Sequence, residues 1–193
     1  PGVDAGRGHR EGHEGETRGG VVLIRADARH IPLKDKSVQC CVTSPPYWGL
    51  RDYGVPGQLG LEATPEEYVA RMLSVFREVR RVLKNDGVLW LNLGDSYASS
   101  TKGSGGPPKK QLSNAGSRCE ISQRLSHGLK DKDLVGIPWR VAFALQADGW
   151  YLRSDIIWAK PNPMPESVTD RPTKAHEYIF LLSKSAKYYY NAE

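Results

Sequence analysis

The sequence has little cysteine and lacks the patterns of membrane, secreted and zinc-binding proteins. Its three cysteines include the adjacent pair Cys40 and Cys41, which cannot form a disulfide framework and indicates a reducing, cytoplasmic location. No apolar run approaches the roughly 18 residues of a membrane span, and the Gly-, Arg- and His-rich start has no apolar secretory core. Because no CxxC pair occurs, we expect no zinc or other metal site. Because no long apolar run occurs, we expect no contact with a membrane.

The composition describes a basic, folded domain. The net charge is +5, and 39% of the residues are hydrophobic, which is typical of one globular domain with a positive surface suited to nucleic acid. Residues 1–20 have no apolar periodicity and are expected to form a flexible tail before a folded part at 21–193. Because the chain starts without methionine and stops inside the structured pattern "YYYNAE", we expect it to be a piece of a longer protein.

Apolar periodicity predicts an α/β fold. A β-branched run at 21–28 indicates a buried strand, and a second strand at 38–47 ends in two prolines. A helix begins at Pro65, because Thr64 is a good N-cap and proline fits the first helical position. The expected elements after 47 are a helix at 65–83, a strand at 88–94, a long loop at 98–133, a helix at 137–149, a strand at 150–160 and a hairpin of two strands at 176–192. This order predicts a mostly parallel sheet with a terminal antiparallel hairpin.

Polar or rigid residues follow three of the predicted strands. Asp27 ends the first, the quartet 44–47 (Ser-Pro-Pro-Tyr) ends the second, and residues 92–95 (Asn-Leu-Gly-Asp) end the third. In open α/β sheets, ligands bind beyond the carboxyl ends of the strands. We therefore expect the functional site at this edge.

The quartet 44–47 suits an exocyclic amine. Two prolines stiffen the segment and leave its carbonyls outside helical hydrogen bonds, so the Ser44 hydroxyl and the Pro45 carbonyl form a rigid pair of acceptors. An amine held by two such acceptors has a localised lone pair that can attack an electrophilic methyl group, through positioning and electrostatics alone. Tyr47 offers a ring on which a base flipped out of a duplex can stack.

The quartet also resembles a known motif. "TSPPY" is similar to motif IV, (D/N/S)PP(Y/F/W), of the amino-methylating DNA methyltransferases; residues 44–98 resemble the run from motif IV to motif VI, and residues 156–190 resemble the motif VII–VIII region. The resemblance covers about residues 21–192. It implies a Rossmann-like methyltransferase sheet, S-adenosylmethionine as cofactor, double-stranded DNA as partner, and Ser44, Pro45, Pro46 and Tyr47 as the catalytic tetrapeptide.

The resemblance suggests further site residues, each with a structural alternative. Asp27 matches the acidic position near the adenine of the cofactor, although it can equally cap a turn. Asp95 lies at a strand end, where a site role and a loop-capping role are both open. Trp158, Lys160 and Asn162 resemble the loop beside the target base, but the tryptophan can also belong to the core and the lysine to the solvated surface.

The segment after the quartet is a candidate DNA contact. Aromatic Trp48 and Tyr53 flank Arg51, which can bind a phosphate or pair with Asp52. The long loop adds basic residues that suit phosphate contacts as well as a solvated linker: Lys102, Lys109, Lys110, Arg118, Arg124 and Lys130. The pair 176–177 (His-Glu) is expected to serve strand-edge packing or a hydrogen bond rather than catalysis.

One family element is missing. No DPFxGSGT-like loop, which would hold the methionine end of the cofactor, occurs here, and "KGSGGPP" at 102–108 lacks the strand and the Asp-Pro-Phe that precede such a loop. The order fits the permuted β subgroup, so we expect the sheet to be incomplete here and the loop to lie beyond Glu193 or on a second polypeptide.

These features predict methyl transfer to a DNA base, with cytosine N4 favoured. In the family, serine at the first motif position is commoner in cytosine-N4 enzymes, whereas aspartate is commoner in adenine-N6 enzymes. The alternatives are adenine-N6 methylation, methylation of RNA or of a protein amide, and a catalytically inactive DNA-binding fragment.

Overall fold

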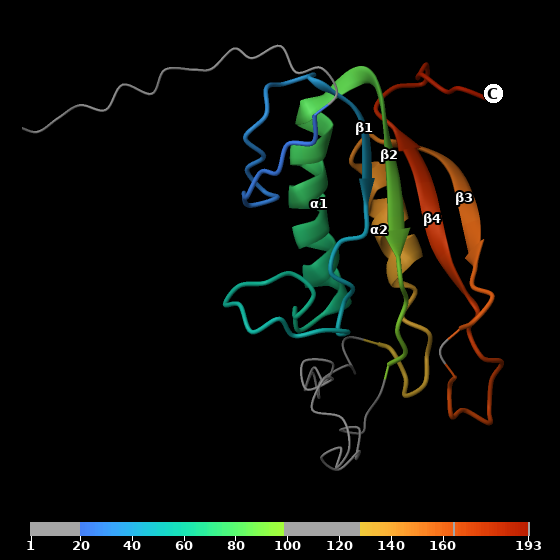
Figure 1. Cartoon of the computed structure of the whole chain (residues 1–193). Coiled ribbons are helices and arrows are strands. Elements are labelled where there is room, and N and C mark those ends of the chain that lie inside the picture. The colour runs from blue at the N-terminus through green and yellow to red at the C-terminus, as the bar shows by residue number, and fades with distance from the viewer. Residues whose placement is uncertain (1–19, 99–127, 164, 193) are drawn as a thin grey trace, which may run out of the picture.

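The computed structural model describes residues 20–98, 128–163 and 165–192. Within these ranges, four strands form one sheet in the order β1-β2-β4-β3, with two helices packed against it (Figure 1). The elements are β1 (Val38–Thr43), α1 (Pro65–Val82), β2 (Leu83–Leu93), α2 (Ile137–Ala147), β3 (Tyr151–Ala159) and β4 (His176–Ser183). The arrangement confirms the expected Rossmann-like α/β class.

The strand directions bring distant segments to one edge. β1 is parallel to β2, and β4 is antiparallel to both of its neighbours, β2 and β3. Three strands therefore run in one direction, and only the last strand is reversed. As a result, the carboxyl ends of β1, β2 and β3 meet the amino end of β4 at the lower edge of the sheet in Figure 1. We call this the carboxyl edge.

α1 begins where the sequence predicts. The Thr64 side chain accepts a hydrogen bond from the Glu67 backbone nitrogen at 3.1 Å, and Pro65 occupies the first turn. The Glu67 carboxylate accepts from the backbone nitrogen of Ala63, also at 3.1 Å, so it satisfies a donor one residue before the cap. Arg80 and Arg81 in the last turn complement the negative end of the helix dipole.

A single core joins both helices to one face of the sheet. Leu89, Leu91 and Leu93 alternate along β2 and therefore point to the same face, where they are fully buried. They pack with apolar side chains of β4 and of both helices: Phe180, Leu182, Tyr68, Met72, Phe76, Val79, Ile137, Val141, Ala142 and Leu145. Burial of each large side chain contributes about 1.5–3 kcal/mol, so this core fixes the position of the carboxyl edge.

The predicted strand at 21–28 is wrong for this structure. Residues 21–28 have no strand conformation, and Val21 is 91% exposed. A strand needs a neighbour for its backbone hydrogen bonds, and among the described strands β1 pairs only with β2. The chain that follows packs instead against the C-terminal half of α1, where Arg81 donates to the carbonyls of Ile31 and Leu33 at 2.7 and 3.0 Å.

The predicted hairpin at 176–192 is also wrong, because only its first half forms a strand. β4 lies between β2 and β3, so both of its edges are occupied. The following residues run beside the start of β2, where the backbone nitrogens of Lys184 and Tyr189 donate to the carbonyls of Gly87 and Asp86 at 3.1 and 3.2 Å. The antiparallel strand is therefore β4 itself, which pairs with β2 and β3 inside the sheet instead of forming a hairpin with the residues that follow it.

The predicted tail and most of the predicted long loop lie outside the described residues. The two ends of the loop are joined, because Ala98 donates from its backbone nitrogen to the Asp133 carbonyl at 2.8 Å and accepts from Lys132 at 2.9 Å. Of the basic loop residues, only Lys130 lies in the described part. Among the described residues, no helix has the length and apolarity needed to cross a membrane.

Candidate active site

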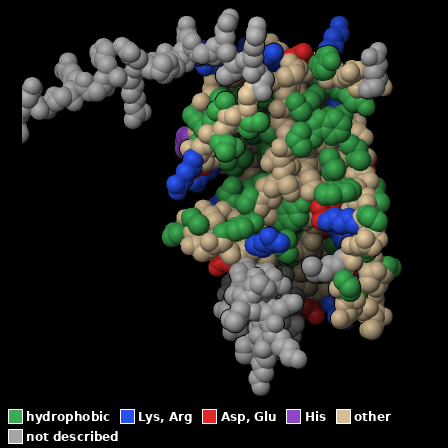
Figure 2. Space-filling view, viewed as in Figure 1, with side chains coloured by type: hydrophobic (Ala, Val, Ile, Leu, Met, Phe, Trp, Pro, Cys, Tyr) green, Lys and Arg blue, Asp and Glu red, His purple; other side chains and the backbone are tan. Residues whose placement is uncertain are grey.

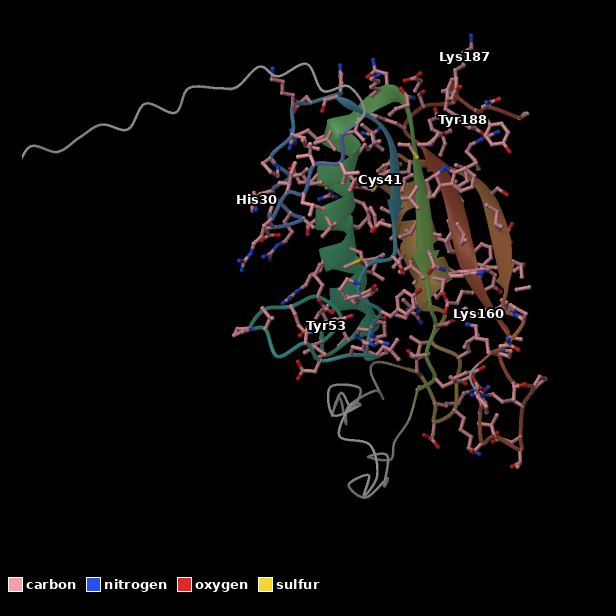
Figure 3. All side chains as sticks on the ribbon, viewed as in Figure 1. His30, Cys41, Tyr53, Lys160, Lys187 and Tyr188 are labelled. Atoms are coloured by element: carbon pink, nitrogen blue, oxygen red, sulfur yellow. The ribbon has the colours of Figure 1, made fainter. Side chains whose placement is uncertain are left out.

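The carboxyl edge collects polar side chains from three strands. Ser44 follows β1, Asn92 lies near the end of β2, and Glu177 is the second residue of β4. Strand pairing opposes Glu177 to Trp158, and Lys160 just after β3 contacts both side chains. Figure 3 shows Lys160 at the lower edge of the sheet. Residues separated by more than 130 positions thus share one surface.

Tyr47 is the centre of a hydrogen-bonded cluster. Its hydroxyl oxygen lies 2.6 Å from Asn92 Oδ1, 3.1 Å from Glu177 Oε2 and 3.1 Å from Ser44 Oγ. Ser44 Oγ also lies 3.2 Å from Asn92 Oδ1. The ring is therefore fixed at its outer end by residues of all three neighbouring strand ends.

The contacts of this cluster limit where its protons lie. Asn92 Nδ2 donates to the carbonyl of Tyr178 at 3.1 Å, which turns the Asn92 amide oxygen toward Tyr47 and Ser44 as an acceptor. The Tyr47 hydroxyl donates toward Asn92 Oδ1 and Glu177 Oε2, so Ser44 gives its single proton inward, to Asn92 Oδ1 or to Tyr47 Oη. The exposed Ser44 oxygen is then left with lone pairs directed away from the cluster. Ser44 is held as an acceptor, as the amine chemistry requires.

The carbonyls of Pro45 and Pro46 differ in their hydrogen bonding. The Pro46 carbonyl accepts a hydrogen bond at 2.9 Å from the hydroxyl of Tyr68, a fully buried residue of α1. Within the described ranges, the Pro45 carbonyl accepts no hydrogen bond. The quartet is therefore anchored through Pro46, and Pro45 retains a free acceptor next to Ser44.

Two glycines make room for the quartet. A Cβ atom on Gly94 would lie 2.6 Å from Cδ2 and Cε2 of the Tyr47 ring, so no larger residue fits there without moving the ring. A Cβ on Gly60 would lie 2.9 Å from the Tyr47 carbonyl, and its φ of +96° also favours glycine. The position of Tyr47 thus depends on the absence of side chains at both places.

An ion pair sets the charge beside Tyr47. The Lys160 ammonium contacts the Glu177 carboxylate and lies 5.1 Å from the centre of the half-exposed Trp158 ring. Burial raises the pKa of the Glu177 carboxyl, but the hydrogen bond and charge of Lys160, together with hydrogen bonds from Asn92 and Tyr47, outweigh it and hold that pKa below its ordinary value. Glu177 is therefore ionised at neutral pH. Burial, together with this carboxylate, raises the pKa of the Tyr47 phenol, which stays neutral.

The structure places two predicted site residues in structural roles. Trp48 is 1% exposed, and its indole nitrogen donates to the Glu62 carbonyl at 2.9 Å, so its ring belongs to the core and does not face DNA. Asp95 Oδ1 accepts from the backbone nitrogens of Ser96 and Ile137, both at 2.9 Å, and so caps the start of α2. The loop-capping alternative therefore holds for Asp95.

Asp27 is not brought to the carboxyl edge by any described contact. It lies in a turn, where its carboxylate binds the Arg29 guanidinium at 2.7 Å. Hydrogen bonds from Arg29 hold the pKa of this carboxyl at about 2. These contacts fit the alternative in which Asp27 caps a turn. The cofactor role of Asp27 stays a prediction.

The remaining predicted contacts are exposed. Arg51 and Tyr53 lie in the loop between β1 and α1. Tyr53 is on the other side of the carboxyl edge from Lys160 (Figure 3). The alternative pairing of Arg51 with Asp52 is absent from the ion pairs of the described residues, and Asp52 accepts from Gly54 instead, at 2.7 Å. Asn162 is exposed beyond β3. These positions are compatible with DNA contacts.

Three residues of the site were missed in the sequence. For Glu177 the sequence predicts strand-edge packing or a hydrogen bond and no place in the site, and for Gly94 and Tyr68 it predicts no individual role. The signal for Glu177 is the reversed direction of β4, which places its amino end beside the carboxyl ends of its neighbours. Tyr68 and Gly94 contact the quartet through tertiary packing alone, which no local pattern reveals.

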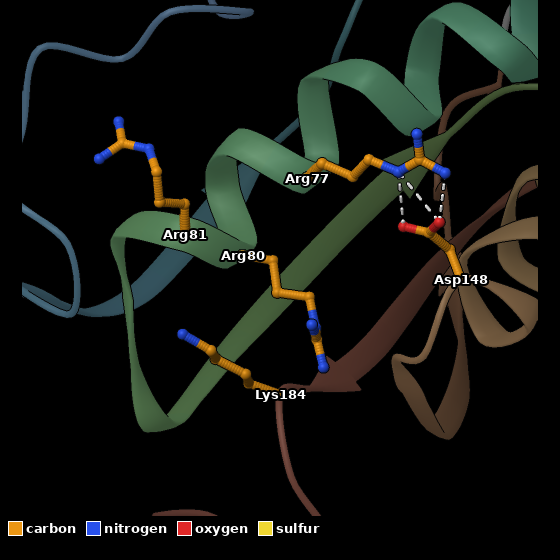
Figure 4. Close-up of a pocket in the computed structure, with 5 residues that line it drawn as sticks. All are labelled: Arg77, Arg80, Arg81, Asp148 and Lys184. Atoms are coloured by element: carbon orange, nitrogen blue, oxygen red, sulfur yellow. Dashed lines mark hydrogen bonds and ion pairs between the residues drawn. The ribbon is translucent and has the colours of Figure 1, made fainter.

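A second concave region lies at the opposite end of the sheet. A cleft of about 440 Å³ is lined by basic residues of α1 and by Lys184 (Figure 4). Arg77 forms an ion pair with Asp148 at 2.6 Å, Arg81 pairs with Glu78 at 2.9 Å, and Lys184 donates to the Leu83 carbonyl at 2.7 Å. These cations already have partners in the fold. No cluster of potential metal ligands occurs in the described part of the chain.

Comparisons with known proteins agree with this geometry. Residues 38–193 match the family model described as DNA methylase, for N6 and N4 methyltransferases. The chain is 53% identical over 176 residues to the Type II methyltransferase M.Cfr9I of Citrobacter freundii, and 56% identical over 173 residues to M.SmaI of Serratia marcescens. The matches cover 90% and 89% of this chain and 58% of each relative, so the chain spans less than two thirds of their length.

Solved structures share the fold. The PvuII DNA methyltransferase (cytosine-N4-specific) aligns with a TM-score of 0.54 at 20% identity, over 81% of this chain and 46% of its own. A DNA modification methylase of Thermus thermophilus, complexed with S-adenosyl-L-methionine, aligns with a TM-score of 0.53 at 23% identity, over 86% of this chain and 54% of its own. Because the family model matches residues 38–193, which are most of this chain, the chain belongs to the N6/N4 DNA methylase family.

Proposed function

We propose that the protein carrying this chain transfers a methyl group from S-adenosylmethionine to the exocyclic amine of a DNA base that has left the double helix. The observation that carries the proposal is the exposed Ser44 oxygen, whose own proton is committed inward, next to the free Pro45 carbonyl. Two fixed acceptors bind both N–H groups of an amine and localise its lone pair. Membership of the DNA methylase family supports the same chemistry.

The described residues leave room for the cofactor. β1 is an edge strand in the described sheet, and Val42, two residues before Ser44, is 77% exposed. The side of Ser44 away from β2 is therefore open to a second ligand. S-adenosylmethionine supplies an electrophilic methyl group when it is bound, and Asp27 is the position proposed to hold its adenine.

Cytosine N4 is the proposed target. Serine at the first position of the quartet favours this assignment over adenine N6, because in the family it is commoner in cytosine-N4 enzymes. The names of the relatives further suggest a modification enzyme of a type II system. Double-stranded DNA is the proposed partner, and the exposed Arg51 and Tyr53 are proposed to contact it.

The test is an analysis of methylated nucleosides. The full-length protein is incubated with cofactor labelled in its methyl group and, in parallel reactions, with unmethylated DNA, RNA or protein, and the labelled products are digested and identified. We expect label in N4-methylcytosine. Label in N6-methyladenine would assign adenine N6 as the target in place of cytosine N4. Label in RNA or protein alone, or in no product, would contradict the proposed function. DNA that the protein has already methylated is the matched control and should accept no further label.

A further inference from the structure

We propose that Glu177 is the terminal proton acceptor of the site, reached from the target amine through Ser44 and Tyr47. This inference rests on the proposed function and extends it to the proton that methyl transfer releases. We call the chain of Ser44 Oγ, Tyr47 Oη and Glu177 Oε2 the relay. Its two links are each 3.1 Å long.

The reaction must dispose of one proton. The amine nitrogen uses its lone pair to form the N–CH3 bond, while the electrons of the S–CH3 bond return to sulfur, whose positive charge is lost. The nitrogen gains that charge and must release a proton. A protein group close to the amine can stabilise the charge as it develops and can then accept the proton.

The cluster around Tyr47 has fewer protons than acceptors. Two hydroxyl protons, those of Ser44 and Tyr47, serve three acceptors: Tyr47 Oη, Asn92 Oδ1 and Glu177 Oε2. When Ser44 donates to Tyr47 and Tyr47 donates to Glu177 Oε2, the three groups form one chain of hydrogen bonds in which the outer lone pairs of Ser44 stay free. The cluster can therefore take up a third proton at Ser44: Ser44 accepts it and passes its own to Tyr47, whose proton moves to Glu177.

The surroundings of Glu177 suit this role. Oε1 is bound by the Lys160 ammonium, whereas Oε2 faces the Tyr47 hydroxyl. The carboxylate is partly buried, so its charge acts on the cluster with little screening. An exocyclic nitrogen that carries both a methyl group and a positive charge is strongly acidic, so even a carboxylate stabilised by Lys160 can accept its proton.

Glu177 acts through Tyr47 and Ser44 and is therefore a positioning residue. Its removal should lower the rate of methyl transfer without loss of DNA binding. In the full-length protein we expect Glu177→Gln, which keeps the shape but removes the charge, to lower the single-turnover rate at least tenfold. Glu177→Asp keeps the carboxylate and should restore part of that loss. Glu66→Gln removes an exposed carboxylate that pairs with Arg140, and as the matched control it should leave the rate unchanged.

A second measurement does not depend on activity. With 3-fluorotyrosine at position 47, the ¹⁹F resonance reports the ionisation of the phenol. Because the Glu177 charge contributes to the raised pKa of Tyr47, Glu177→Gln should move this titration to lower pH, while Glu66→Gln should not move it.

The outcomes separate the relay from the proposed function. A wild-type protein that methylates DNA, with Glu177→Gln as fast as wild type, would overturn the relay and leave the function intact. A ¹⁹F titration that is identical in both proteins would also overturn it. A wild-type protein that transfers no methyl group to DNA would overturn both proposals.

Discussion

The two ends of the sheet are both polar, but they use their polar groups in opposite ways. At the amino end, cations of α1 are bound by carboxylates and carbonyls of the fold, as in the Arg77–Asp148 pair (Figure 4). At the carboxyl edge, the hydrogen bonds of Ser44 with Tyr47 and of the Pro46 carbonyl with Tyr68 hold the quartet so that Ser44 and the Pro45 carbonyl keep free acceptors. Figure 2 shows the surface of the molecule in the view of Figure 1. A charged cleft is thus a poor guide to function here. At the carboxyl edge, the site is marked by two adjacent, rigidly held acceptors that face outward.

The largest effect should come from removing the free acceptor. We expect Ser44→Ala to lower the rate of methyl transfer on the order of 10²-fold, by analogy with the loss of one preorganised hydrogen-bonding group. The measurement is the single-turnover rate of the full-length protein. Thr43→Ser, at the neighbouring position inside β1, is the control and should keep nearly full rate. A Ser44→Ala protein as fast as the control would mean that the acceptor pair is not the catalytic feature.

The next effect should come from crowding the Tyr47 ring. Gly94→Ala places a Cβ within 2.6 Å of two ring atoms, and such overpacking costs about 1–3 kcal/mol. We expect slower methyl transfer and a lower melting temperature.

A double-mutant cycle isolates this clash. If the ring is the obstacle, Gly94→Ala should cost little stability when it is combined with Tyr47→Ala, because the neighbouring atoms are gone. Additive costs in the double variant would show that Gly94 acts elsewhere.

Loss of the ring itself should weaken the hold on the flipped base. We expect Tyr47→Ala to reduce binding of DNA that contains an unpaired target base by roughly 1–3 kcal/mol, the usual worth of one stacked base. The dissociation constant, measured by fluorescence anisotropy, provides the test. Tyr151→Ala removes an exposed ring at the start of β3, away from the carboxyl edge, and should bind DNA as the wild type does.

The smallest effect should come from the basic cleft. Asp148→Asn weakens the ion pair with Arg77, in which the Arg77 side chain is 64% exposed and the Asp148 side chain 16% exposed, and a pair that solvent reaches on one side contributes little to stability. We expect an unchanged rate of methyl transfer and a small drop in melting temperature, both measured beside wild type. A large loss of activity would show that the amino end takes part in function, and the contrast between the two ends would fail.

The sequence predicts those parts of the molecule that local patterns control. α1 begins at Pro65 because capping at Thr64 and apolar periodicity agree, and the Ser-Pro-Pro-Tyr quartet ends β1 because proline cannot extend a paired strand. The strand expected at 21–28 has the right residues, yet no described strand pairs with it. Apolar composition alone does not provide such a partner.

Burial and topology account for the other differences. Trp48 looks like a DNA contact in the sequence, but the chain after the quartet turns back and buries the ring against Glu62. Glu177 looks like a residue of an outer strand, but β4 enters between β2 and β3 and carries it to Tyr47. Both outcomes depend on contacts between distant segments, which local sequence patterns do not specify.

The acceptor pair is tested most directly by a crystal structure of the full-length protein bound to duplex DNA and a non-reactive cofactor analogue. We expect the target base outside the helix, with its exocyclic nitrogen within hydrogen-bonding distance of both Ser44 Oγ and the Pro45 carbonyl and its ring against Tyr47. A base bound elsewhere, or one whose amine contacts neither oxygen, would contradict the account.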